Sequence, residues 1–232
     1  MYLTGGTSGV FQANWYVAGP ADGSACVIID PGQDAAEACR AAVAASGRSV
    51  AAVLATHGHI DHVADAAALA DGYGVPLFIH EADRPFLADP VAALTPDAAP
   101  VIAAMFPHGL RQAHEVREYP LDQESGAGGL GIGGLEFTLV HAPGHTPGCV
   151  LLAVVGAAGG PAVVFTGDVV FAGSIGRTDF QVGDAAAMRR TLRERVLPLP
   201  DAAVLLPGHG PASDMARERL TNPYLQADFL AG

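Results

Sequence analysis

The sequence predicts an α/β fold in which sheets are covered by helices. Short apolar runs, typical of buried strands, alternate with alanine-rich segments, typical of helices, through both halves of the chain. Several apolar runs end in a glycine-containing loop that carries a histidine or an aspartate, where α/β folds place reacting groups. Half of the 232 residues are hydrophobic and 16% are charged, which suits a compact globule. No linker or low-complexity tract divides the chain, so we expect one domain over residues 1–232.

The first half of the chain alternates between predicted strands and helices. Apolar runs bounded by turn residues predict the strands, and alanine-rich segments predict the helices. In order, these are strands over 11–18 and 25–30, a helix over 34–45, a strand over 50–55, a helix ending near 71 and a strand over 76–79. Asp34 is the candidate N-cap of the first helix and Gly47 its stop signal. Residues 80–111, with five prolines, predict a short helix and a loop that borders a pocket.

The second half of the chain repeats this alternation. It predicts strands over 135–140, 149–155 and 162–166, a helix over 184–196, a strand over 204–206 and a terminal helix from about residue 213. Residues 126–131 match GxGxxG, but they lead into a strand rather than a helix. A dinucleotide site needs a helix N-terminus after the glycines, so this segment predicts only a flexible turn.

Charge and composition exclude several classes of protein. The formal net charge is −12 and all 12 basic residues are arginines, so we expect no nucleic-acid partner, no P-loop lysine and no Schiff base. No apolar run approaches the ~18 residues of a membrane span, and residues 1–10 do not resemble a secretory signal. We therefore expect a cytoplasmic protein without membrane association, whose three widely spaced cysteines are reduced and buried.

The strongest local signal is the run His57-Gly-His59-Ile-Asp61-His62, directly after a predicted strand and before a helix. His57 and His59 lie two residues apart and can turn their imidazoles toward one ion. Asp61 and His62, at the start of the helix, point elsewhere and can serve a second ion nearby. Imidazole and carboxylate groups suit zinc, iron and manganese, so the run predicts a metal site rather than four satisfied core residues.

Three later segments also place a ligand-type residue in a glycine-containing loop after a strand. They carry His145 in His-Ala-Pro-Gly-His-Thr-Pro-Gly, Asp168 in Thr-Gly-Asp and His209 in Pro-Gly-His-Gly. Each is a moderate signal alone, because Gly-Asp after a strand is often only a turn. Together with the first run they predict one site. His141, four residues before His145, is expected to have a structural role.

This ordered series of motifs resembles the metallo-β-lactamase superfamily over nearly the whole chain. Residues 171–180 and 207–211 are similar to single-domain, glyoxalase II-like hydrolases, the hydroxyacylglutathione hydrolase-like group. The resemblance implies an αββα sandwich with its metal site along one edge of two sheets. It also implies two metal ions: His57, His59 and His145 hold one, Asp61, His62 and His209 hold the other, and Asp168 bridges both.

The resemblance further implies a metal-dependent hydrolase that cleaves a thioester of a 2-hydroxyacyl group with a metal-bridging hydroxide. The two divalent ions are expected to be zinc, with iron or manganese as alternatives, and Asp61 also orients the attacking hydroxide. Arg177 and His108 are candidate substrate-binding residues. For Arg177, an ion pair with Asp179 that fixes the loop near Asp168 is the alternative role. The small-molecule thiol, the acyl group and the oligomeric state stay open.

Three alternatives fit parts of the same pattern. A persulfide dioxygenase of the superfamily would hold a single iron on His57, His145 and Asp168, two histidines and one carboxylate. A lactonase-type ester hydrolase or a β-lactamase would use the same hydroxide chemistry. A zinc-stabilised binding module is disfavoured, because structural zinc sites are closed and rich in cysteine, whereas seven ligands for two ions leave open positions.

Overall fold

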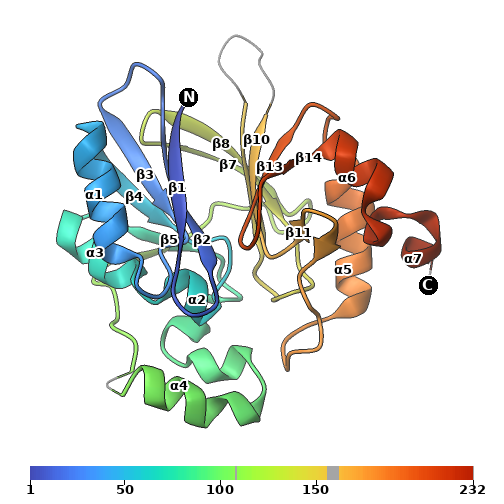
Figure 1. Cartoon of the computed structure of the whole chain (residues 1–232), viewed down its shortest axis with the longest axis horizontal. Helices are drawn as coiled ribbons and strands as arrows, with labels where there is room; N and C mark the ends of the chain where they lie inside the picture. Colours follow the sequence, from blue (N-terminus) through green and yellow to red (C-terminus); the bar gives the residue numbers. More distant parts are fainter. Residues whose placement is uncertain (108, 156–161, 232) are drawn as a thin grey trace.

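The computed structural model describes residues 1–107, 109–155 and 162–231, and it shows four layers (Figure 1). Two six-stranded sheets face each other in the middle, α1 and α3 cover one outer face, and α5 and α6 cover the other. The predicted αββα sandwich is therefore confirmed. Among the described residues, no helix combines the length and the apolar character that crossing a membrane requires.

The first sheet combines an antiparallel and a parallel half. Its strands, in spatial order, are β1 (Tyr2–Ser8), β2 (Ala13–Gly19), β3 (Ala25–Ile29), β4 (Ser49–Leu54), β5 (Leu77–Ile79) and β6 (Val116–Glu118). The pairs β1–β2 and β2–β3 are antiparallel, whereas β3, β4, β5 and β6 run parallel. Because parallel strands end at one edge, the loops after β3 and β4 come together there.

The second sheet is mostly antiparallel. Its strands, in spatial order, are β14 (Ser213–Asp214), β13 (Val204–Pro207), β10 (Val163–Gly167), β9 (Val150–Val154), β8 (Leu135–His141) and β7 (Ala127–Ile132). Only β10 and β13 pair in parallel, so both end at the same edge. A small hairpin of β11 (Val170–Phe171) and β12 (Ser174–Ile175) follows β10.

The described helices are α1 (Ala36–Ser46), α2 (Ile60–Val63), α3 (Ala66–Tyr73), α4 (Ala99–Met105), α5 (Ala185–Thr191), α6 (Met215–Thr221) and α7 (Ala227–Ala231). A π-helical turn over Leu192–Val196 continues α5, so the predicted helix over 184–196 is confirmed. Three short 3₁₀ turns, Arg84–Leu87, Pro90–Ala93 and Pro96–Ala98, precede α4. Figure 1 shows α4 beyond the edge of the sheets, on the side where α2 lies.

Three buried clusters fill the spaces between the four layers. Along β3, Cys26 and Ile28 pack toward α1 and α3, whereas Val27 and Ile29 pack between the two sheets. This alternation follows from the two-residue period of a strand, and it explains why a strand covered on both faces is continuously apolar. The third cluster lies between the second sheet and α5, where Met188 is fully buried.

Two sequence predictions about local structure are wrong. Asp34 is not an N-cap: its φ is 59° and the helix begins at Ala36, whose N–H donates to Asp65 Oδ2 over 2.8 Å. The glycine-rich segment forms β7 rather than a turn, pairing along β8 at the edge of its sheet. Gly47, in contrast, ends α1 with a left-handed φ of 65°, as predicted.

Candidate metal centre

All seven predicted ligand residues lie at one edge of the sandwich, where strands of both sheets end. The loop after β4 carries His57 and His59, α2 carries Asp61 and His62, and the β8–β9 loop carries His145. Asp168 follows β10 and His209 follows β13. His57, His59, His62, His145 and Asp168 are buried, whereas Asp61 and His209 are partly exposed. His108, the other predicted substrate contact, lies outside the described residues.

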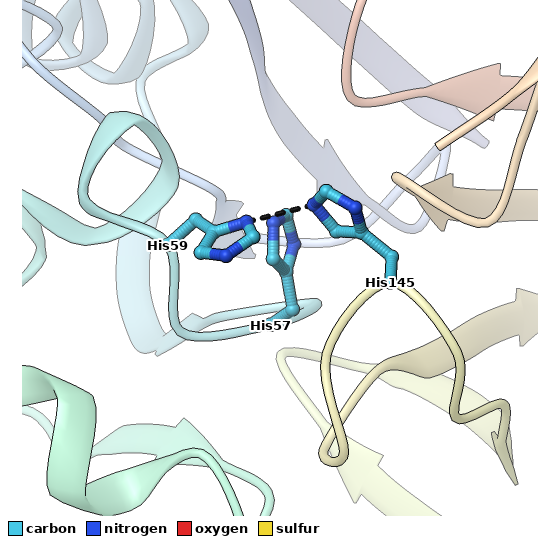
Figure 2. A group of neighbouring side chains, drawn as sticks. All are labelled: His57, His59 and His145. Atoms are coloured by element: carbon cyan, nitrogen blue, oxygen red, sulfur yellow. Dashed lines mark hydrogen bonds between the residues drawn. The ribbon is translucent and has the colours of Figure 1, made fainter. Parts of the chain in front are cut away.

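Three histidines from two loops form the first potential ligand group (Figure 2). One ring nitrogen each of His57, His59 and His145 lies within 4.8 Å of the others. His59 Nδ1 and His145 Nε2 are 2.7 Å apart, and the buried His57 Nε2 has no hydrogen-bond partner among the described residues. Nitrogen atoms that face one another in this way can surround a metal ion, as the two-residue spacing of His57 and His59 predicts.

Asp61, His62 and His209 form the second potential ligand group, again within 4.8 Å. His209 Nε2 lies 3.2 Å from Asp61 Oδ2 and 3.3 Å from His62 Nε2. An isolated β-bridge between Ala13 and His209 holds the β13 loop against the first sheet. The second group is therefore assembled from both sheets.

Asp168 lies between the two groups. Its Oδ2 is 3.4 Å from His145 Nε2 and 3.6 Å from His209 Nε2, and its Oδ1 is 3.5 Å from His62 Nε2. Asp168 Oδ1 is buried, and no residue in the described part of the chain forms a hydrogen bond with it. A buried carboxylate oxygen and a buried imidazole nitrogen left unpaired are destabilising on their own, and cations bound at the two groups would satisfy them. The donor set therefore fits divalent metal ions.

Burial keeps the first group of histidines neutral. The pKa of His57 lies well below its ordinary value, because of burial first and the neighbouring histidines second. Burial also lowers the pKa of His59 to about 3 and that of His145 to about 4. A neutral imidazole presents the lone pair that a metal ion needs, so these side chains are prepared to bind one.

In the second group, Asp61, His62 and His209, the pKa values depend on opposite charges as well as on burial. Burial alone would lower the pKa of His62, but the carboxylates of Asp61 and Asp168 outweigh it and raise the pKa to about 10. Burial raises the pKa of Asp168, whereas His62 and a hydrogen bond with His209 overcome burial and lower the pKa of Asp61. The metal-free protein thus places a proton on His62 between two carboxylates, where a metal cation can replace that positive charge.

Asp30, at the end of β3, orients part of the first ligand run. It accepts hydrogen bonds from the backbone N–H of Thr56 over 2.7 Å and from the Thr56 hydroxyl over 2.6 Å. Its Oδ2 also lies 3.3 Å from His62 Nδ1. His62 Nε2 is thereby left to face Asp168 and His209, as expected for a residue that sets the orientation of a ligand imidazole.

Asp83 joins the two loops that carry the three histidines. It is fully buried after β5, and its Oδ2 accepts from Gly58 N–H over 2.8 Å and from the Thr146 hydroxyl over 2.6 Å. Its Oδ1 accepts from Gly148 N–H over 2.7 Å. The sequence analysis did not predict this role of Asp83. Its partners are mainly backbone groups far away in the chain, and no spacing pattern indicates them.

Two predicted structural roles near the centre are confirmed. Arg177 pairs with Asp179 through both its Nε, at 2.6 Å, and a terminal nitrogen, at 2.7 Å. The backbone carbonyl of Arg177 accepts from His145 Nδ1 over 2.7 Å, so this loop orients a ligand histidine. His141 Nε2 donates to the Pro147 carbonyl over 2.7 Å and so braces the turn after His145.

A cavity of about 580 Å³ opens onto both groups, and His59, Asp61, His145, Asp168 and His209 form its floor. Residues 94–102 and 171–180 contribute to its walls, so the prediction that the proline-rich region borders a pocket is confirmed. The three cysteines, Cys26, Cys39 and Cys149, are buried and unbridged, as predicted, and lie outside this cavity.

The fold and the metal-ligand groups agree with the comparison with protein families. The family model of the metallo-β-lactamase superfamily matches residues 8–209. The chain therefore belongs to the metallo-β-lactamase superfamily, and its two His/Asp groups give it the metal-binding side chains of a metallo-hydrolase.

Relatives and solved structures match almost the whole chain. A Mycobacterium tuberculosis protein of uncharacterised function is 37% identical, covering 97% of this chain and 98% of that protein. The hydroxyacylglutathione hydrolase GloC of Haemophilus influenzae is 32% identical, covering 86% and 87%. The crystal structure of the B3 metallo-β-lactamase BLEG-1 matches with a TM-score of 0.80 and 32% identity, covering 97% of this chain and 100% of that chain. TTHA1623, solved in a di-iron-bound form, matches with a TM-score of 0.74 and 32% identity, covering 96% and 100%.

Proposed function

We propose that this protein is a thioester hydrolase of the glyoxalase II type, which cleaves the S-acyl bond of a small 2-hydroxyacyl thiol. The observation that carries the proposal is the pair of adjacent ligand groups, with Asp168 between them, on the floor of an open cavity. The likeness to the hydroxyacylglutathione hydrolase of Haemophilus influenzae supports the choice of a thioester.

The assignment of ligands follows the two groups. One ion would be held by His57, His59 and His145, with the neighbouring Asp168 carboxylate as a further ligand. A second ion would be held by Asp61, His62 Nε2 and His209 Nε2. Two divalent ions, when bound, supply hydroxide near neutral pH and polarise the carbonyl oxygen of the substrate. Zinc suits this histidine-rich set, and the di-iron relative makes iron an equal candidate.

The protein's own groups position the reactants. Asp61 lines the cavity beside His209 and, with a lowered pKa, stays ionised to accept a hydrogen bond from the attacking water. His145 is held in one orientation, because its Nδ1 donates to the Arg177 carbonyl. A thiolate leaves readily, so the reaction needs no separate acid group for the leaving sulfur.

Metal content and turnover, measured on the same preparation, test this proposal. We expect about two divalent ions per chain by elemental analysis and hydrolysis of S-lactoyl thioesters, with absorbance at 240 nm as the readout. The His209→Gln variant should retain about one ion and lose more than about 100-fold in kcat/KM, since it removes a ligand outright. His114→Gln, the same change at a side chain that is 88% exposed, is the matched control and should keep both properties.

Other outcomes would replace the proposal. A single iron per chain, with oxygen consumption on a persulfide and no thioester cleavage, would assign the protein as a dioxygenase that uses His57, His145 and Asp168. Hydrolysis of lactones without hydrolysis of thioesters would keep the two-ion chemistry and change the substrate.

A further inference from the structure

Besides the polar residues of its floor, the cavity is lined by two sets of apolar side chains, which we call its walls. One wall comes from the segment around α4 and includes Leu94, Val101 and Ile102. The other wall, from the segment after β10, includes Phe171 in β11 and Phe180. Val101 is 54% exposed although it belongs to this wall, so its side chain is accessible to a molecule entering the cavity. A wall of this kind gains free energy by covering hydrocarbon.

Arg177 is the one arginine among the described residues that line the cavity. Its charge is compensated, because the guanidinium group forms two parallel hydrogen bonds with the Asp179 carboxylate and lies 4.2 Å from the centroid of the Phe180 ring. The two side chains are exposed and carry opposite charges, so an approaching carboxylate meets the negative charge of Asp179 together with the positive charge of Arg177. The walls therefore present a neutral ion pair rather than a free positive charge.

This arrangement disfavours a charged substituent on the substrate away from the metal centre. A carboxylate placed against apolar walls loses hydration without gaining a partner. The net charge of −12 also repels an anionic molecule as it approaches. Glutathione carries two carboxylates and one ammonium group, so its thioesters would bring such charges to the walls. The positive charge of bound metal ions acts at the floor, where the reacting carbonyl lies.

We propose that the walls bind an uncharged, hydrocarbon-rich part of the substrate, so that the substrate class is thioesters of uncharged thiols rather than of glutathione. Val101 and its neighbours on α4 then determine specificity by contacting this part. This inference rests on the proposed thioester hydrolysis. It concerns binding to the walls, so it is tested separately from the chemistry at the floor.

Binding of thioethers, which cannot be hydrolysed, tests the inference on the zinc-loaded protein. S-hexyl-N-acetylcysteamine is uncharged, and S-hexylglutathione has the same alkyl chain on a charged thiol. We expect the uncharged thioether to bind at least tenfold more tightly by isothermal titration calorimetry. S-methyl-N-acetylcysteamine should bind more weakly than the hexyl compound by about fourfold for each methylene that the wall covers. Equal or tighter binding of S-hexylglutathione, or no binding of either hexyl compound, would overturn the inference.

A charge placed on the wall should shift this preference. In Val101→Lys, the ratio of the two hexyl affinities should fall by about tenfold, because the wall loses hydrocarbon and gains a cation for the carboxylates. Leu220→Lys is the matched control: Leu220 is 80% exposed on α6 and does not line the cavity. An unchanged ratio in Val101→Lys, or an equal fall in Leu220→Lys, would count against the wall as the binding surface.

Turnover separates this inference from the proposed function. If S-hexyl-N-acetylcysteamine binds preferentially but no thioester is cleaved, the proposed chemistry fails and the preference of the walls stands. If S-lactoylglutathione is cleaved with a kcat/KM equal to or above that of S-lactoyl-N-acetylcysteamine, the chemistry stands and the inference fails.

Discussion

Asp83 shows how one buried carboxylate can determine the geometry of a site it does not enter. It accepts hydrogen bonds from Gly58 and Gly148, next to the loop ligands His57, His59 and His145. In Asp83→Ala, two backbone N–H groups and the Thr146 hydroxyl lose their acceptor. We expect a loss of about 3 kcal/mol or more in the free energy of unfolding and a 10- to 100-fold loss of metal affinity.

Urea denaturation and a competitive chelator titration measure the two effects of Asp83→Ala. Asp22→Ala, at an exposed position between β2 and β3, is the control and should leave both unchanged. A variant that loses less than about 1 kcal/mol while binding metal normally would show that Asp83 does not brace the loops.

Gly208 is required beside the centre because a side chain would not fit there. A Cβ at this position would overlap Asp168 Oδ1 and lie 2.7 Å from His62 Cε1. Gly208→Ala should therefore push Asp168 or His62 out of place and weaken metal binding more than about tenfold. The measurement is metal content after dialysis against a weak chelator. Gly72→Ala, where a Cβ would make only an ordinary contact with Arg40 Nη2 at 3.9 Å, should retain the metal, and equal metal content in the two variants would contradict this account.

The sequence predicted which candidate ligand residues lie together, but it did not predict the residues that support them. The close spacing in one short run indicates four of them, His57, His59, Asp61 and His62. The glycine-containing loops after predicted strands indicate the other three, His145, Asp168 and His209. Asp30 and Asp83 act on backbone N–H groups 26 and 25 residues away, a relation that exists only once the strands are aligned. No local pattern encodes such a contact.

At the scale of elements, apolar content decided which strands could be predicted. Buried strands such as β3 and β4 are continuous apolar runs and were predicted to within a residue or two. The edge strand β1 contains glycine, threonine and serine, and the edge strand β7 is rich in glycine, because an edge strand has one partner and less to bury. Their pairing with β2 and β8 comes from the neighbouring strand rather than from their own propensity.

The first residues of α5 contact the loop that carries His145. Asp184 caps the helix by accepting from the N–H groups of Ala186, at 2.8 Å, and Ala187, at 2.9 Å, while its own N–H donates to the Gly144 carbonyl. Asp184→Ala should lower the free energy of unfolding by about 1 kcal/mol, whereas Asp184→Asn should retain most of the cap. Thermal denaturation of both variants checks the expectation, and equal losses in both would mean that charge rather than capping is responsible.

At the scale of the whole molecule, the candidate metal centre is formed by residues from both sheets. Residues 57–62 come from the first sheet, and the other three ligand residues come from the second. Side chains that are buried and neutral in the folded protein become accessible to protons on unfolding. The stability of the metal-free protein should therefore depend on pH through these histidines.

The sign of that dependence follows from the direction of the pKa shifts. Folding lowers the pKa of His59 to about 3 and that of His145 to about 4, against about 6.5 in the unfolded chain. Below pH 6.5 the unfolded chain therefore binds more protons, and the folded state loses stability as the pH falls. His62, whose pKa is raised to about 10, contributes in the opposite direction above pH 6.5 and does not cancel this loss at pH 5 to 6. The raised pKa of Asp168 opposes the loss, so the histidine contribution must be isolated by substitution.

Urea denaturation of the chelator-treated protein between pH 5 and 6 measures the contribution of the histidines to the pH dependence of stability. Replacing His59 and His145 together by glutamine removes two groups that protonate on unfolding. The slope of unfolding free energy against pH should therefore decrease by on the order of 1 kcal/mol per pH unit for each histidine. His114→Gln, at an exposed histidine, should leave the slope as it is in the unmodified protein. If the double variant keeps the full slope of unfolding free energy against pH, other groups cause the loss of stability in acid. Burial then does not keep these two histidines neutral in the absence of metal.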